Sequence, residues 1–80
     1  MKKIIQFHTM EEIEHFVYLL NQYEDINVDV KYGKYVVDGK SYLGVLALGL
    51  CKDLVLVFDK TNEDLISKLK EQYEIKDFNL

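Results

Sequence analysis

Few side chains in this chain of 80 residues have the chemistry of a catalyst or a carrier. The histidines are His8 and His15, and the one cysteine is Cys51. An imidazole can accept a phosphoryl group or bind a metal, and a thiolate can act as a nucleophile. These residues are too few and too scattered for a metal site, so we expect neither a metal nor a cofactor. Nothing beside Cys51 predicts an activated thiolate, and we interpret it as a half-buried, inert thiol.

Ser41 is the strongest single candidate for a modified residue. It follows Lys40 and begins a short apolar segment, 42–48, that Gly49 ends, which is typical of a short helix with Ser41 as its N-cap. A phosphate on the serine would meet the N–H groups of the helix start and the Lys40 ammonium. The alternative interpretation is that Ser41 only caps the helix.

The carboxylates near the histidines have a simpler interpretation. Glu11, Glu12 and Glu14 lie on the solvated side of a predicted helix, and His15 follows Glu11 by four residues. That spacing allows a weak interaction across one helical turn. We therefore interpret these residues as a charged helix surface, and not as an acid/base pair.

The composition narrows the classes of function. Apolar residues make up 49% and charged residues 30%, which is an ordinary globular balance. The net charge is −4, and all ten basic residues are lysines, so nucleic-acid binding is not expected. No apolar run approaches the ~20 residues of a membrane span, and no leader pattern is present. These features predict one small cytoplasmic domain over 1–80. A domain of this size has no room for an enclosed active site, so we expect any chemistry on its surface and another macromolecule as its partner.

The first half of the chain predicts a strand, a helix and a hairpin. An apolar run over 4–7 indicates the strand, and Thr9 with Glu12 forms a capping box before a helix over about 10–22. Apolar and polar residues alternate over 26–38 around a turn at 32–34, which indicates a β-hairpin.

The second half predicts a short helix, a strand and a last helix. In the helix over 42–48, the inward face is expected to consist of Leu43, Leu46 and Ala47, with Gly44 allowing close packing. The continuous apolar run over 53–58 indicates a strand with a central place in the sheet. Thr61 and Asp64 form a capping pair that predicts the start of the last helix. Residues 74–80 predict an extended tail through Ile75 and Phe78.

These elements predict an α+β open-faced β-sandwich. The order is β-α-β-β-α-β-α, with a four-stranded, mostly antiparallel sheet whose one face carries the helices.

That order and the segment from Lys40 to Gly49 resemble the HPr phosphocarriers of the bacterial sugar phosphotransferase system. The family pattern is Lys-Ser, two apolar residues, Gly-Val, two further residues and Leu-Gly, and this chain fits it without a gap. The resemblance covers nearly the whole chain. It implies a phosphocarrier-like protein that is not an enzyme. It also implies regulatory phosphorylation of Ser41, because the matching serine of Gram-positive members is phosphorylated by an ATP-dependent kinase.

The chain departs from the family at the start of the first helix. The family has Gly-Leu/Ile-His-Ala-Arg-Pro there, and its histidine carries the phosphoryl group. Counting back from Ser41 places Met10 at the histidine position, whereas the apolar face of the helix places Thr9 there. The arginine position falls on Glu11 or Glu12, which would repel a phosphoryl group. His8 lies one or two residues before the family's histidine position, and it is the weak alternative carrier.

The resemblance also implies a surface for partner proteins at the starts of the first and the short helix. We assign it to Thr9, Met10, Lys40, Tyr42, Leu43 and Leu46, with Tyr42 expected to point outward. The partners implied are phosphotransferase-system components, a serine kinase or a transcriptional regulator. Three hypotheses remain open: a regulatory module without histidine phosphotransfer, an active phosphocarrier that uses His8, and a purely structural interaction domain.

Overall fold

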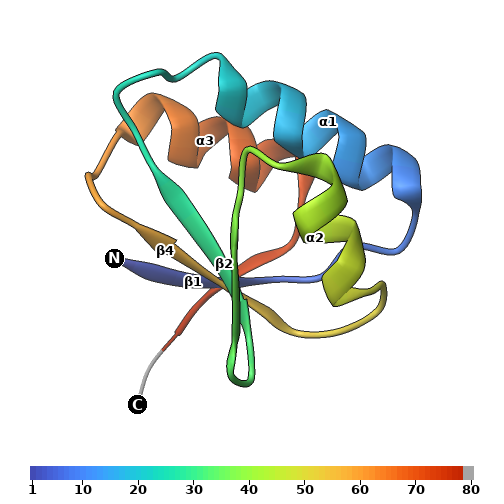
Figure 1. The fold of residues 1–80 in the computed structure, drawn as a ribbon. Coiled ribbons are helices and arrows are strands. Elements are labelled where there is room, and N and C mark those ends of the chain that lie inside the picture. The colour runs from blue at the N-terminus through green and yellow to red at the C-terminus, as the bar shows by residue number, and fades with distance from the viewer. Residues whose placement is uncertain (79–80) are drawn as a thin grey trace.

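The computed structural model describes residues 1–78, and it confirms an α+β fold in which the helices cover one face of an open sheet (Figure 1). Alternate residues of the strands pack against these helices, so the core lies between the two layers. In chain order the elements are β1 (Lys2–Ile5), α1 (Met10–Asn21), β2 (Val28–Tyr32), β3 (Tyr35–Asp38), α2 (Tyr42–Leu48), β4 (Leu54–Phe58), α3 (Glu63–Gln72) and β5 (Ile75–Asp77).

The sheet has five strands in the order β3-β2-β4-β1-β5, and each neighbouring pair is antiparallel. The prediction of four strands was wrong, because the segment after α3 turns back and pairs Ile75 with Ile5. The extended tail therefore forms a real edge strand, while residues 79–80 of the predicted tail lie outside the described part. The central place expected for the fourth strand is confirmed, since β4 lies between β2 and β1.

Two strand limits differ from the sequence prediction. β1 covers Lys2–Ile5 and not 4–7, because the apolar run continues past the strand into Phe7, which packs in the core without pairing to the sheet. The hairpin starts at Val28 and not at 26, although Ile26 is buried. The apolar pattern therefore predicted which residues are buried, but it did not predict where the hydrogen-bonded strands begin and end.

Three aromatic rings join the start of α1 to the end of α3. Phe7 and Phe16 are fully buried, with their ring centroids 5.0 Å apart, and Tyr73 packs edge-on against both. Edge-to-face pairs of this kind contribute beyond the apolar area that they bury. The Tyr73 hydroxyl donates to the carbonyl of Glu12 at 2.9 Å, so α3 holds the first turn of α1 in place.

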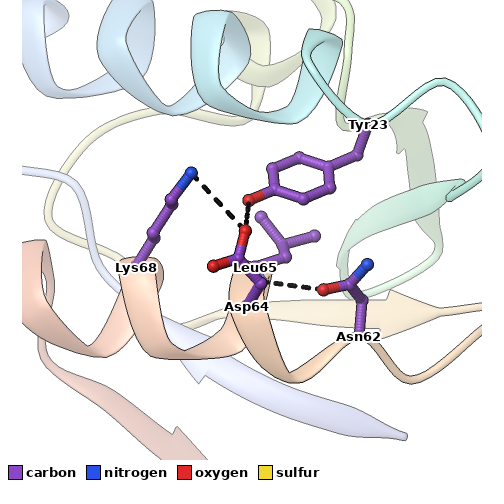
Figure 2. Close-up of polar contacts among 5 residues, drawn as sticks. All are labelled: Tyr23, Asn62, Asp64, Leu65 and Lys68. Carbon is purple, nitrogen blue, oxygen red and sulfur yellow. Dashed lines mark hydrogen bonds and ion pairs between the residues drawn. The ribbon is translucent and has the colours of Figure 1, made fainter.

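A polar contact joins the other ends of α1 and α3 (Figure 2). The hydroxyl of Tyr23, just after α1, donates to the Asp64 carboxylate at 2.5 Å, and Lys68 lies 3.5 Å from the same oxygen. The hydrogen bond from Tyr23, followed by the charge of Lys68, lowers the pKa of Asp64. The helix itself is capped by Asn62, which accepts from the N–H of Leu65, so the predicted capping pair at Thr61 was wrong by one residue.

Two glycines make the hairpin and its exit possible. Gly33 has a φ of +58° in the two-residue turn between β2 and β3, a conformation that favours glycine. Gly39 lies so close to β2 that an added Cβ would be 2.8 Å from the carbonyl oxygen of Val28. The chain can therefore leave the sheet at Gly39 and start α2 directly.

Candidate functional site

The first turn of α1 uses its own side chains to satisfy its backbone. Thr9 is the N-cap, as predicted, and its hydroxyl accepts from the N–H of Glu12 at 3.1 Å. The Glu12 carboxylate in turn accepts from the N–H of His8, also at 3.1 Å. A carboxylate at this end of a helix is stabilised by the helix dipole. The first turn of α1 thus carries an anion of the chain itself, hydrogen-bonded to the residue before the N-cap.

His8 precedes α1 and is exposed. Its Nδ1 lies 3.7 Å from the Sγ of Cys51, and the backbone N–H of Cys51 donates to the carbonyl of Phe7 at 2.7 Å. Cys51 has a φ of +60°, and it is exposed, so its interpretation as a half-buried thiol was wrong. No local pattern predicts this contact, because 43 residues separate the two side chains in the sequence.

The surroundings of His8 are acidic. A surface hollow of about 410 Å³ lies beside it, and its charged lining consists of three carboxylates and one ammonium group, contributed by Glu12, Asp53, Glu74 and Lys76. A phosphoryl group adds a charge of about −1.5 to −2 at neutral pH. The Coulomb interaction with these carboxylates would therefore oppose phosphorylation of the imidazole.

The remaining candidates on α1 point to solvent. Met10 is the first residue of the helix and has 49% of its surface exposed. His15, Glu11 and Glu14 are exposed on the outer side. Neither position considered for the phosphorylated histidine, Thr9 or Met10, brings an imidazole to the helix start.

Ser41 caps α2 in the predicted way. Its hydroxyl accepts from the N–H of Gly44 at 3.2 Å, and the side chain is exposed. An added Cβ at Gly44 would be 3.2 Å from the Cβ of Val37, so the glycine allows α2 to approach β3 closely. Gly49, with a φ of +99°, ends the helix.

Lys40 does not extend toward the Ser41 hydroxyl. Its Nζ donates to the carbonyl of Tyr23 at 2.8 Å, and its own carbonyl accepts from the side-chain amide of Asn21. In the unmodified chain the ammonium is therefore engaged elsewhere, and its role toward a phosphate on Ser41 stays a prediction. The lysine instead connects the segment before α2 to the end of α1.

The two faces of α2 differ from the sequence prediction. Val45 and Leu48 are its buried residues, whereas Leu43 is 74% exposed and Ala47 is also exposed. The predicted inward face was wrong for Leu43 and Ala47 and half right for Leu46, which is half-buried against the core. Tyr42, expected to point outward, is also half-buried. A helix of seven residues is too short for its apolar spacing to define one face, and its packing against α1 and β3 decided which residues are buried.

Within residues 1–78, no three histidine, cysteine or acidic side chains gather in a way that could hold a metal ion. None of the helices in that part of the chain is long and apolar enough to cross a membrane.

No family model matches this chain, and no curated protein matches its sequence. Its structure is similar to the crystal structure of a phosphocarrier protein HPr from Bacillus anthracis str. Ames, with a TM-score of 0.71. The two chains are 16% identical over 92% of this chain and 96% of the HPr chain. At that identity the likeness concerns the fold, and it agrees with the fold implied by the segment from Lys40 to Gly49. The chain therefore has the fold of the HPr phosphocarriers.

Proposed function

We propose that this HPr-like protein acts by binding partner proteins and does not carry a phosphoryl group on histidine. The start of α1 carries this proposal. The Thr9 hydroxyl already accepts from the N–H of Glu12, and the Glu12 carboxylate accepts from the N–H of His8. Free N–H groups at a helix start are what would hold a bound phosphoryl group, and here a carboxylate lies beside them. The chain has no arginine, and the lysine in the hollow beside His8 is opposed by three carboxylates.

The partner surface that we propose consists of the starts of α1 and α2. Its apolar side chains with the largest exposed fractions are Met10 and Leu43, at 49% and 74%. Thr9, Lys40 and the half-buried Tyr42 and Leu46 complete it. Exposed apolar side chains of this size favour a protein partner. The partner classes that fit are components of the sugar phosphotransferase system, a serine kinase or a transcriptional regulator, all in the cytoplasm, and the protein is not an enzyme.

Ser41 is the proposed regulatory input. Its hydroxyl is exposed at the start of α2, and Leu43 projects from the same turn. Because the Lys40 ammonium is bound to the carbonyl of Tyr23, a phosphate would keep most of its charge available to a partner. Phosphorylation would in this way add an anionic group to the edge of an apolar contact surface.

Two other functions remain as outcomes of the test. His8 is exposed beside the start of α1, and this position favours it as the carrier if the chain accepts phosphate from phosphoenolpyruvate. A domain that neither phosphoenolpyruvate nor ATP can label would serve only as a structural interaction module.

The test of histidine phosphotransfer is incubation with phosphoenolpyruvate and the general kinase of the phosphotransferase system. We expect no acid-labile phosphate on this protein, while an authentic HPr in a parallel reaction is labelled. Label that disappears in His8→Ala and persists in the matched control His15→Ala would overturn the proposal and assign the carrier role to His8.

The test of the regulatory input is incubation with ATP and the HPr serine kinase, followed by mass determination of the intact protein. We expect one phosphate that Ser41→Ala abolishes and that Ser67→Ala, an exposed serine on α3, does not change. An unmodified protein, or a phosphate that Ser41→Ala leaves in place, would contradict regulation through Ser41.

A further inference from the structure

The core-facing side of the hairpin β2–β3 extends beyond the part of the sheet that α1 and α3 cover (Figure 1). Tyr32 pairs with Tyr35 in the register, two residues along from the pair of Val30 with Val37. Because side chains of a strand alternate between faces, both tyrosines lie on the side of the fully buried Val30. They are nevertheless 40% and 59% exposed, and Figure 1 shows the hairpin turn on the side away from α1 and α3.

A groove lies where this end of the hairpin meets the C-terminal end of α2. Its volume is about 360 Å³, at the lower end of the range for ligand pockets. Most of its lining is apolar or aromatic, and it is formed by Tyr32, Tyr35, Val36, Val37, Ala47, Leu48 and Lys52. Val36 is itself 54% exposed, so the apolar surface continues from the groove onto the edge strand.

The charges at this groove have one sign, in a chain whose net charge is −4. The Nζ of Lys52 lies 4.9 Å from the ring centroid of Tyr32, and the Nζ of Lys34 lies 5.6 Å from that of Tyr35. The neighbouring carboxylate of Asp53 instead accepts from the amide of Gln6 at 2.6 Å. The groove thus combines aromatic surface with two ammonium groups that rest on its rings.

We propose that this groove binds an acidic segment of a partner protein. An apolar or aromatic side chain of the segment enters between Tyr32 and Leu48, and flanking carboxylates pair with Lys34 and Lys52. Charge complementarity and the apolar lining together favour this ligand. Nucleic acid fits less well, because the chain has no arginine and the groove has few cations. The proposal is independent of phosphorylation, since Ser41 lies at the opposite end of α2.

The test is a titration of the ¹⁵N-labelled protein, followed by amide chemical shifts. The probes are a synthetic peptide of about nine residues with two phenylalanines among glutamates, the same peptide with lysines in place of the glutamates, and a short oligothymidylate. We expect the acidic peptide alone to shift the amides of 32–37 and 47–52. Its affinity should fall as salt is added, since the ion pairs are exposed.

Substitutions separate this groove from a general charge effect. Lys52→Glu and Tyr32→Ser should each weaken binding of the acidic peptide about tenfold or more. The matched controls are Lys60→Glu, which makes the same charge change at an exposed lysine elsewhere, and Tyr18→Ser on α1, and both should leave affinity unchanged.

Several results would overturn the proposal. They include amide shifts outside the groove, equal binding of the lysine peptide, binding of the oligothymidylate at the groove, and equal losses of affinity in the control variants. Shifts at the groove that depend on protein concentration without any peptide would also reject it, because the occupant would then be a second copy of the chain.

Discussion

Replacing Tyr73 with phenylalanine tests how the end of α3 positions the start of α1. The substitution keeps the ring that packs against Phe7 and Phe16, and it removes only the hydroxyl that donates to the Glu12 carbonyl at 2.9 Å. A hydrogen bond of this type contributes about 1 kcal/mol to the free energy of unfolding. For a domain of this size, the melting temperature should fall by about 4–8 °C.

The same substitution should change the pH dependence of stability. Burial, and to a lesser degree the charge of Glu12, raises the pKa of Tyr73 to about 12 from 10.0. Between these values the unfolded chain releases a proton that the folded chain keeps, so stability is complete below pH 10 and falls as the pH rises toward 12. Two pKa units correspond to about 2.7 kcal/mol, and we expect about half of this because the hydroxyl is only partly shielded from solvent.

The assay is urea unfolding followed by circular dichroism, at several pH values from 7 to 12. The unsubstituted protein should be more stable than Tyr73→Phe by about 1 kcal/mol at pH 7, and the two should become about equally stable near pH 12. Tyr18→Phe, at an exposed tyrosine, is the control and should follow the unsubstituted protein throughout. Parallel pH profiles of the unsubstituted protein and Tyr73→Phe would refute the reasoning.

Three further predictions concern caps, glycines and acid stability. Asn62→Ala should lower the free energy of unfolding by about 1 kcal/mol and Thr61→Ala by much less, because Asn62 caps α3; urea unfolding of both variants checks this. Gly39→Ala should destabilise the protein by about 1–3 kcal/mol, because the added Cβ clashes with a backbone carbonyl. Gly33→Ala has open space around it and should cost only about 1 kcal/mol, because its backbone is left-handed. Thermal unfolding of the two variants measures the difference. The lowered pKa of Asp64 stabilises the fold above about pH 4, and this contribution disappears as the pH falls through the folded-state pKa. Asp64→Asn should therefore lose less stability between about pH 5 and 2 than the unsubstituted protein does. Equal losses of the two proteins in acid titrations would contradict this prediction.

The local signals of the sequence were sufficient for most elements. Thr9 and Ser41 cap their helices as predicted, because a hydroxyl and the N–H three residues later are close along the chain in any helix start. The alternation in the hairpin followed from the period of burial on a sheet, and the continuous apolar run indicated the central strand. The order of the elements predicted the fold class, the segment from Lys40 to Gly49 carried the resemblance to HPr, and the structural likeness to HPr agrees with both.

Other features depended on contacts between residues far apart in the sequence. The fifth strand forms because Ile75 pairs with Ile5 of β1. The thiol of Cys51 contacts the ring of His8, which lies 43 residues away in the sequence. The outward position of Leu43 follows from how α2 packs against α1 and β3, which seven residues of helical spacing do not define.

The sequence by itself determined the caps of the first two helices, the alternation in the hairpin, and that the start of the first helix lacks the histidine and arginine of the HPr pattern. Caps, turns and alternation depend on neighbours within a few residues, so they can be predicted locally. Only the tertiary structure decided that Lys40 is held by the carbonyl of Tyr23, that His8 lies among carboxylates, and that a groove with lysines forms at the hairpin end. The physical reason is that these arrangements depend on the packing of elements against one another, which fixes where a charge or an exposed side chain finally lies.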